Sequence, residues 1–455
     1  MKASISNQIY ISDIPEALSR EITEQLTLPN PKWLENQKMG RWNGRTPRFL
    51  TFYERDIQGL TVPRGFIGQL VTMARRHQIL FQLEDNRRTL PEVPFEFHGQ
   101  LRDFQSDALA DTLPREFGTL QAPTGAGKTV IALGAIAERK QPALVVVHTK
   151  ELLNQWLDRI ETFLEIPKDR IGQIGAGKQA VGDWITVSTV QSLYRCAKEV
   201  APCIGHLIVD ECHRAPSRTF TEAVSAFDSK YMLGLSATPW RRDGLSRLIY
   251  WYLGDLVHEV NREALQDQGH IVKARVVWKQ TDYQTQLDPS EQYSKMLSEL
   301  TRDPDRNSLI ARDVTREAWN GGGVCLVLTD RKEHARTLQQ ILTSYDVRTA
   351  VLTGEVSRKR REAIVKALNK REIKAVCATG HIIGEGFDCK GLSTLFLATP
   401  IKFNGRVLQY LGRILRPAPG KETATVYDYV DRHVGPLVAG AKARARTYRQ
   451  AGVVE

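Results

Sequence analysis

The sequence lacks the features of a membrane, secreted or zinc-binding protein. No run among its 455 residues approaches the roughly 18 consecutive apolar residues of a membrane-spanning helix. The first residues, MKASISNQIYISDIPEAL, contain no apolar core of a signal peptide. The six cysteines form no CxxC pair, and Cys325 and Cys377 lie in apolar runs typical of buried thiols. These absences predict a cytoplasmic protein with no disulfide framework, no zinc site and no membrane partner.

Strong charge of one sign, low-complexity tracts and short internal repeats are also missing. Apolar residues make up 42% of the chain, which is ordinary for globular domains that each bury a core. The length predicts about two to four domains. Lys and Arg number 63 against 52 for Asp and Glu, which leaves a net charge of +11. This moderate excess favours an anionic partner, although a merely solvated basic surface would produce the same balance.

Two series of short apolar runs, separated by helix-like segments, indicate parallel strands that are buried on both faces. The first series includes residues 143–147, 185–188, 206–210 and 231–235. The second series comprises residues 324–328, 347–351, 374–378, 394–399 and 423–427. Helical crossovers between such strands predict an α/β fold with two parallel-sheet lobes in tandem.

The more irregular stretches suggest where the domains divide. Residues 98–265 and 266–455 are predicted to form the two lobes, and the polar stretch 240–307 is interpreted as a linker with one strand at 271–278. Residues 1–97 differ in character, because they carry aromatics and scattered glycine and proline. We expect them to form a separate small α+β domain with helices at 15–26 and 65–76.

The segment Ala122-Pro-Thr-Gly-Ala-Gly-Lys-Thr129 ends an apolar run and precedes a helix expected over 128–139. Such a turn points backbone N–H groups at a triphosphate, and the helix N-terminus adds favourable partial charge. Lys128 would reach the β- and γ-phosphates of ATP, and Thr129 would help to hold Mg²⁺. A plain glycine-rich turn is the alternative, because Ala122 stands where the strict pattern has glycine. The remaining residues predicted to surround ATP here are Pro123, Thr124, Gly125, Ala126 and Gly127.

A second glycine-rich segment, Gly175-Ala-Gly-Lys178, is interpreted differently. Gln179 replaces the hydroxyl residue that a phosphate loop needs after its lysine, and no long apolar strand precedes the segment. We therefore expect a surface turn at this position.

An acidic pair directly follows the apolar run that begins at residue 206. The sequence there is Asp210-Glu211-Cys212-His213. Carboxylates at the end of a parallel strand lie at the edge of the sheet where ligands bind. Asp210 would bind Mg²⁺, and Glu211 would orient and deprotonate the attacking water. A solvated turn is the alternative for an isolated acidic pair, but the preceding buried strand favours a catalytic site.

The segment 122–129, followed by the segment 210–213, resembles the motifs of superfamily 2 helicases. Further matching pieces are Leu101-Arg-Asp-Phe-Gln105, Val187-Ser-Thr-Val-Gln-Ser192, Ser236-Ala-Thr-Pro239, Gly384-Glu-Gly-Phe-Asp388 and Gln409-Tyr-Leu-Gly-Arg-Ile-Leu-Arg416. The resemblance covers roughly residues 98–430 and implies two RecA-like lobes that bind ATP between them and nucleic acid across their tops. Within the superfamily the chain is most similar to the XPB-type branch of DNA helicases and translocases. XPB carries Arg-Glu-Asp where this chain has Arg241-Arg242-Asp243.

The resemblance also implies roles for individual residues. Gln105 would read the adenine edge with Phe104 or Arg102 packing nearby, although an ordinary polar residue on a helix surface is the alternative. Arg413 and Arg416, three residues apart and thus on one helical face, would supply charge to the γ-phosphate. Gly386 and Asp388 would lie at the seam between the lobes. Residues expected to couple hydrolysis to movement are His213, Ser236, Thr238 and Gln409.

Basic residues interleaved with aromatics indicate where nucleic acid would bind. The stretch Lys32–Arg48 holds five basic residues and one acidic residue, together with Trp33 and Trp42. A small β-sheet with core tryptophans and a charged edge is the alternative. Residues 358–374 are more typical of a solvated helix face, and the basic tail at 442–449 is either a binding arm or a frayed end. The individual candidates for nucleic-acid contact are Arg41, Arg45, Arg48 and Arg241.

These features together predict an ATP-driven DNA helicase or translocase, a nucleic-acid-stimulated ATPase in repair, recombination or defence. The partner would be single-stranded, duplex or branched DNA, and the protein would be a monomer that other proteins could recruit. An RNA helicase is one alternative, because the motor motifs barely distinguish the two polymers. A clamp that binds ATP without unwinding is another, which Glu211, Arg413 and Arg416 disfavour because they predict turnover.

Overall fold

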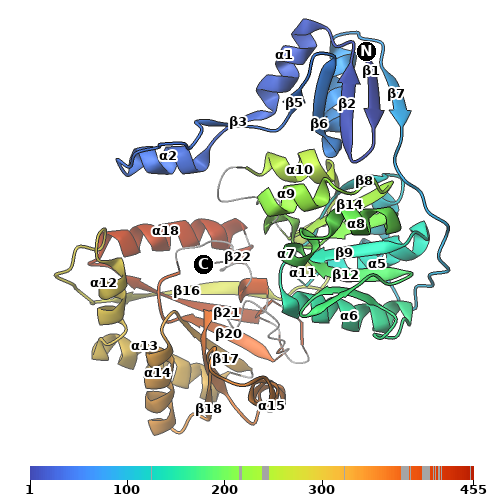
Figure 1. Ribbon diagram of the computed structural model, residues 1–455. Coiled ribbons are helices and arrows are strands. Elements are labelled where there is room, and N and C mark those ends of the chain that lie inside the picture. The colour runs from blue at the N-terminus through green and yellow to red at the C-terminus, as the bar shows by residue number, and fades with distance from the viewer. Residues whose placement is uncertain are drawn as a thin grey trace. The chain divides into compact units, whose positions relative to one another are not determined.

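The chain folds into two compact units, residues 1–123 with 127–260 and residues 261–455 (Figure 1). This computed structural model describes residues 1–123, 125–214, 218–237, 245–321, 323–380, 389, 391–401, 410–412, 414–415, 417–418, 421, 423–450 and 452–454.

The first unit begins with a small mixed sheet in the order β5-β6-β2-β1-β7. Alternate side chains of β2 are buried, which is the pattern of a strand with one face on a core. Two helices complete this part, and both predicted helices are confirmed within a residue or two. The bounds are β1 Lys2–Ile5, β2 Gln8–Ser12, α1 Glu16–Gln25, β5 Glu54–Arg55, β6 Gly59–Pro63, α3 Ile67–Arg76 and β7 Gln82–Asp85.

The second part of the first unit is an eight-stranded sheet in the order β11-β10-β12-β9-β13-β14-β8-β15. All neighbouring strands are parallel except β10 and β11, which form a hairpin. The hairpin turn contains Ala176 and Gly177, so the expected surface turn at 175–178 is confirmed. The strands are β8 Phe117–Gln121, β9 Ala143–Val147, β10 Gly172–Gly175, β11 Lys178–Ala180, β12 Ile185–Thr189, β13 His206–Val209, β14 Tyr231–Ser236 and β15 Leu256–Glu259.

Helices connect these parallel strands, as the predicted crossovers require. The predicted helix over 128–139 coincides with α5. The helices of this part are α4 Asp103–Thr112, α5 Lys128–Arg139, α6 Lys150–Leu164, α7 Val190–Leu193, α8 Ala197–Val200, α9 Arg218–Val224 and α10 Arg247–Leu253.

The small N-terminal sheet packs directly against α10. Leu248 and Trp251 of α10 are buried in the same apolar core as Leu60 and Phe66 from the N-terminal part. The buried Arg64 donates a hydrogen bond of 2.8 Å to the carbonyl oxygen of Ser229. Residues 1–97 are therefore held to the larger sheet by a packed core and by buried hydrogen bonds. The predicted domain boundaries at 97 and 265 stay predictions.

The second unit contains a seven-stranded sheet in the order β18-β19-β17-β20-β21-β16-β22, and every neighbouring pair is parallel. The predicted α/β class, with two parallel sheets after a small mixed domain, is thus confirmed. The strands are β16 Lys273–Thr281, β17 Val324–Thr329, β18 Thr349–Leu352, β19 Ala375–Thr379, β20 Leu392–Leu397, β21 Thr423–Asp431 and β22 Val453–Val454. The helices are α11 Arg262–Asp267, α12 Tyr293–Leu300, α13 Pro304–Asn320, α14 Lys332–Ser344, α15 Arg358–Asn369 and α18 Gly435–Gln450.

Two buried ion pairs attach helices of the second unit to β21. Arg306 of α13 donates to Asp431 over 2.8 Å, and Arg444 of α18 forms a two-point pair with Asp428 at 2.7 Å. Both arginines are almost completely buried, so each needs its carboxylate partner. The basic tail at 442–449 is therefore neither a free arm nor a frayed end, because it forms part of a packed helix.

The cysteines are free thiols that lie mostly in the protein interior. All six cysteines are free, and only Cys203 is exposed. Burial raises the pKa of the Cys325 and Cys377 thiols, which matches their interpretation as inert core residues. Across the part of the chain that the structure describes, no helix has both the length and the apolar character needed to cross a bilayer.

The close approach of Gly65 to α10 gives a test of the N-terminal docking. A methyl group at position 65 would lie 2.3 Å from Tyr250 O and 2.5 Å from Gly254 N, which are backbone atoms that cannot swing aside. We expect Gly65→Ala to lower the free energy of unfolding of the first unit by about 1–3 kcal/mol.

The measurement is hydrogen exchange at β6 and α10 together with the urea midpoint. Gly354→Ala is the control, since a methyl group there would meet no atom within 4 Å. Equal protection in the two variants would show that the N-terminal sheet is not tightly docked.

Candidate nucleotide-binding and catalytic site

Three adjacent parallel strands of the first unit end at the same edge of the sheet. They are β13, β14 and β8, which lie in that order. The acidic pair follows β13 after Val209, Ser236 is the last residue of β14, and the glycine-rich segment follows β8 after Gln121. The backbone N–H of Ala122 donates to the carbonyl oxygen of Ser236 over 2.9 Å, which ties two of these segments together. The sheet thus gathers the predicted site residues of the first lobe.

The glycine-rich segment has the backbone of an anion-binding loop. Gly125 and Gly127 have φ values of +94° and +83°, which side chains rarely permit. Helix α5 begins directly afterwards at Lys128, and no side chain caps its first turn. The N–H groups of that turn can therefore meet an anion. Pro123 and Ala126 are buried beside the loop, and Thr129 lies in the first helical turn.

Lys128 and Glu211 face one another across this edge. The ammonium Nζ of Lys128 lies 3.9 Å from Glu211 Oε1 and donates to the carbonyl oxygen of Ala122 over 3.2 Å. The lysine is 8% exposed, so its charge is held near the loop and not in solvent. Glu211 has a φ of +50°, an unfavourable value for a residue with a side chain. Strain of this kind is concentrated at functional sites.

Asp210 is held by two hydrogen bonds in a buried environment. Its Oδ1 accepts from the backbone N–H of Glu211 over 2.8 Å, and its Oδ2 accepts from Trp156 Nε1 over 2.8 Å. Burial, together with the neighbouring charge of Glu211, raises the pKa of Asp210 to about 6. Each carboxylate oxygen still has a lone pair available, so the group can ligate a hard cation such as Mg²⁺.

Sequence reasoning missed Trp156. Its position in α6 follows a buried helical stripe with Leu153, Leu157 and Ile160, so the pattern indicates a core residue. The one available signal is chemical, because a buried indole N–H usually finds an acceptor. Here that acceptor is the Asp210 carboxylate, which makes Trp156 a positioning residue for the acidic pair.

His213 connects the acidic pair with Ser236. Its Nδ1 atom lies 3.2 Å from Glu211 Oε2 and 3.1 Å from Ser236 Oγ. Ser236 is fully buried at the end of β14. Two of the four residues expected to couple hydrolysis to movement are therefore in contact with each other, and one of them, His213, also meets Glu211.

Gln105 lies against the glycine-rich loop. The residue is buried, and a methyl group at position 127 would approach its Nε2 atom to 2.4 Å. Its Oε1 atom accepts from the backbone N–H of Arg102 over 3.0 Å at the start of α4. The alternative of a polar residue on a helix surface is therefore wrong. The proposed contacts of Gln105 and Arg102 with adenine stay predictions.

Several predicted site residues fall outside the described part of the chain. They are Thr124, Thr238, Arg241, Gly386, Asp388, Gln409, Arg413 and Arg416. The remaining candidates for nucleic-acid contact, Arg41, Arg45 and Arg48, are exposed in the N-terminal part of the first unit.

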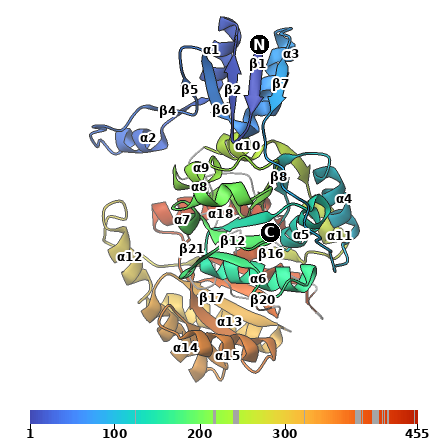
Figure 2. The same ribbon diagram turned by 45° about the vertical axis from the view of Figure 1, so that its right-hand side comes forward.

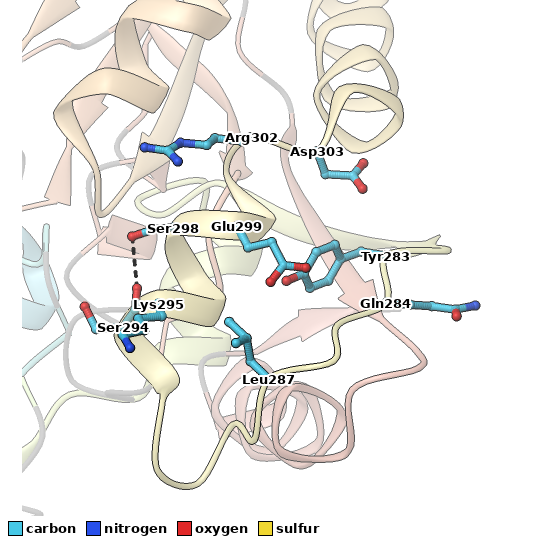
Figure 3. A pocket seen from close by; sticks show the side chains of 9 residues that line it. All are labelled: Tyr283, Gln284, Leu287, Ser294, Lys295, Ser298, Glu299, Arg302 and Asp303. Atoms are coloured by element: carbon cyan, nitrogen blue, oxygen red, sulfur yellow. Dashed lines mark hydrogen bonds between the residues drawn. The ribbon is translucent and has the colours of Figure 1, made fainter.

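The second unit contains a cavity of about 590 Å³ beside α12 (Figure 3). Charged side chains of both signs line it, among them Lys295, Glu299 and Arg302. Burial raises the pKa of the neighbouring Tyr283 to about 12. None of the predicted site residues that the structure describes lines this cavity, and its mixed charge favours no single class of ligand.

Comparison with known proteins agrees with this arrangement of motifs. Residues 98–241 match the family described as Type III restriction enzyme, res subunit, and residues 310–418 match the Helicase conserved C-terminal domain. The chain is 34% identical over 205 residues to the DNA 3'-5' translocase XPB2 of Sulfurisphaera tokodaii, which covers 44% of this chain and 46% of that relative. The chain thus spans about half of the length of this relative.

Two further comparisons extend over more of the chain. The ATP-dependent DNA helicase uvsW of Enterobacteria phage T4 is 25% identical over 359 residues, or 75% of this chain and 70% of that protein. The structure of S. cerevisiae Dbp5 bound to RNA and ADP BeF3 matches with a TM-score of 0.53 and 15% identity, over 79% of this chain and 89% of Dbp5. The latter likeness concerns the fold alone.

The roles of Lys128 and Glu211 can be separated by substitution. We expect Lys128→Ala to weaken ATP binding, because a phosphate contact is lost. Glu211→Gln should keep ATP binding but slow hydrolysis by about 10²–10⁴-fold, because the base is lost. Nucleotide binding and phosphate release are the two measurements.

Glu165→Gln is a matched control for this pair. Glu165 also has a left-handed φ, of +52°, and it is exposed at the end of α6, so its loss should leave hydrolysis unchanged. Full turnover in Glu211→Gln would contradict its role as the base.

The hydrogen bond from Trp156 to Asp210 predicts that a substitution at Trp156 changes how ATP hydrolysis depends on the Mg²⁺ concentration. Trp156→Phe keeps the aromatic packing but removes the donor to Asp210, so the carboxylate loses its orientation. If Asp210 ligates Mg²⁺ as the sequence predicts, we expect the Mg²⁺ concentration for half-maximal ATP hydrolysis to rise about tenfold, the usual effect of losing a partner of a metal ligand. Trp251→Phe, at a buried tryptophan in the N-terminal core, is the control. An equal Mg²⁺ requirement in both variants would leave Trp156 with a packing role alone.

Proposed function

Because the chain belongs to superfamily 2 of the helicases, we propose that it uses ATP hydrolysis to move along DNA or to unwind it. One observation carries the proposal. Lys128, Asp210 and Glu211 meet at one sheet edge, and His213 joins Glu211 to Ser236. A passive binding module has no need for two carboxylates beside a largely buried lysine at this position.

The residues of the first unit have complementary tasks in hydrolysis. Lys128 and the N–H groups of the α5 turn would bind the phosphates of ATP and stabilise the charge that develops on them. Glu211 would orient the attacking water and accept its proton. Asp210 with Thr129 would hold Mg²⁺, which would supply further positive charge beside the phosphates. Gln105 and Arg102 would contact the adenine.

The motif resemblance supports the remaining roles. We propose that Arg413 and Arg416 supply charge to the γ-phosphate during hydrolysis, with Gly386 and Asp388 close to the nucleotide. Thr238 and Gln409, together with His213 and Ser236, would couple ATP hydrolysis to movement. Arg241 would contact nucleic acid. Bound polynucleotide would favour the conformation in which these residues act together, as expected for a motor that hydrolyses ATP on its track.

DNA is the preferred track in this proposal. The relatives named above are a DNA translocase and a DNA helicase, and the proposal rests on the similarity to them. RNA is the alternative track, since the motor motifs are shared by both groups. A clamp without turnover is less consistent with the placement of Glu211 beside Lys128. The cellular role would lie in repair, recombination or defence, for a monomer recruited by other proteins.

The proposal predicts that ATP hydrolysis depends on nucleic acid. We expect DNA to raise the rate at least about tenfold, which lowers the barrier by about 1.4 kcal/mol. Phosphate release is measured with single-stranded, duplex and forked DNA and with RNA of the same sequence. Glu211→Gln gives the background rate.

The comparison of DNA with RNA tests which polymer the protein moves along. If RNA raises the rate of ATP hydrolysis more than any of the DNA substrates does, RNA is the favoured polymer. Equal rates with and without either polymer would contradict a nucleic-acid motor.

A further inference from the structure

The N-terminal part of the first unit carries an arm that has no core of its own. Residues 27–51 form it, with β3 Thr27–Pro29 and β4 Phe49–Thr51 as an antiparallel pair and α2 Pro31–Lys38 between them. Both views show α2 projecting away from the sheet that contains β1 and β2 (Figures 1 and 2). Helix α2 buries none of its side chains. Apolar packing therefore does not explain why the arm is helical.

Asparagine side chains hold the arm in shape instead. Asn30 caps α2 by accepting from the N–H of Lys32 over 3.0 Å, and its Nδ2 donates to the carbonyl oxygen of Pro47 over 2.8 Å. Asn36 donates to Asn43 over 3.1 Å and so joins the helix to the loop that follows it. These bonds order the loop before any ligand arrives, which lowers the entropy lost on binding.

Trp42 stands on this ordered loop with 91% of its surface exposed. Its ring lies over Gly44, because a methyl group at position 44 would come within 2.8 Å of the Trp42 Cζ3 atom. The loop backbone thus supports the indole on one side while the rest of the ring meets solvent. A rigid, flat and accessible indole is a surface on which a nucleobase can stack.

The charges around Trp42 identify the kind of partner. The segment 32–48 holds five basic residues and one acidic residue, and Arg41 and Arg45 flank Trp42 and are exposed. Arg48 has a different position, since its guanidinium lies 5.4 Å from the ring centroids of both Trp33 and Phe49. Arg48 therefore stabilises the arm by cation–π contacts, while Arg41 and Arg45 can meet phosphates.

We propose that the arm binds an unpaired base of a polynucleotide, with Trp42 stacked on the base and with Arg41 and Arg45 on the adjoining phosphates. This inference rests on the proposed function and adds to it a preference for branched over fully paired DNA. The arm belongs to the same compact unit as Lys128 and Glu211, so it is carried by the lobe that binds the nucleotide.

The test compares forked DNA with a fully paired duplex of the same sequence, using the full-length chain. We expect Trp42→Ala to bind the fork about tenfold more weakly, the effect of losing one base–aromatic stack, and to bind the duplex almost unchanged. Trp42→Tyr should restore fork binding, because tyrosine keeps a stacking face. Trp319→Ala, which removes another exposed tryptophan, is the control.

Abasic substrates and two glycine variants separate stacking from other effects. A fork whose unpaired nucleotides lack bases should bind wild type and Trp42→Ala equally. Gly44→Ala should resemble Trp42→Ala, because its methyl group displaces the indole. Gly40→Ala is the matched control, since Gly40 also has a positive φ, of +62°, but a methyl group there meets no atom within 4 Å.

The outcomes distinguish this inference from the proposed function. If Trp42→Ala binds forks as tightly as wild type while DNA still stimulates ATP hydrolysis, the stacking role is wrong and the motor stands. A protein-docking role for the arm would then be favoured. An equal loss on forks, duplexes and abasic forks would show that the arm acts through charge or folding and would also overturn the stacking role. Absence of both DNA binding and DNA stimulation in wild type would overturn the two proposals together.

Discussion

The nucleotide site depends on a small group of charges that is largely buried at one edge of a parallel sheet. Asp210 and Glu211 bring two carboxylates close to the single ammonium of Lys128. Such an imbalance is costly away from water. Burial, and after it the neighbouring charge of Glu211, raises the pKa of Asp210. A bound cation would remove the excess negative charge, and a phosphate would give Lys128 a second anionic partner. The edge is therefore suited to a cation and a polyphosphate together more than to either alone.

The surrounding structure holds this group in an unfavourable geometry. Glu211 has a left-handed backbone, and its own N–H bonds the carboxylate of Asp210. Trp156 fixes the other oxygen of that carboxylate from α6. Ala122 donates to Ser236, and His213 contacts both Ser236 and Glu211, so direct contacts link the acidic pair to the end of β14. These contacts are where a coupling between the acidic pair and β14 can be tested by double-mutant cycles.

Local patterns predicted most of the parallel strands but missed β10, β15 and β22, and contacts between distant residues were not predictable. The range 143–147 matches β9, since five successive apolar side chains are buried on both faces. The helix at 128–139 matches α5, because glycine precedes it and Lys140 ends it in a left-handed conformation. In contrast, Arg444 belongs to a run of basic residues that is typical of a surface tail. Only the fold shows that Asp428 lies beside it in the interior. Trp156 is hidden in the same way within an apolar helical stripe.

Two tryptophans of the first unit show the difference between stabilising a fold and presenting a surface. Trp251 is 1% exposed and joins α10 to the N-terminal sheet, so its burial contributes directly to stability. Trp42 buries almost no area, and the hydrogen bonds around it order a loop without closing a core. The stability of the fold therefore gives no reason for an indole at position 42. An exposed indole between Arg41 and Arg45 is explained instead by binding. A polynucleotide with unpaired bases offers a base that can stack on the indole and phosphates that can pair with the arginines.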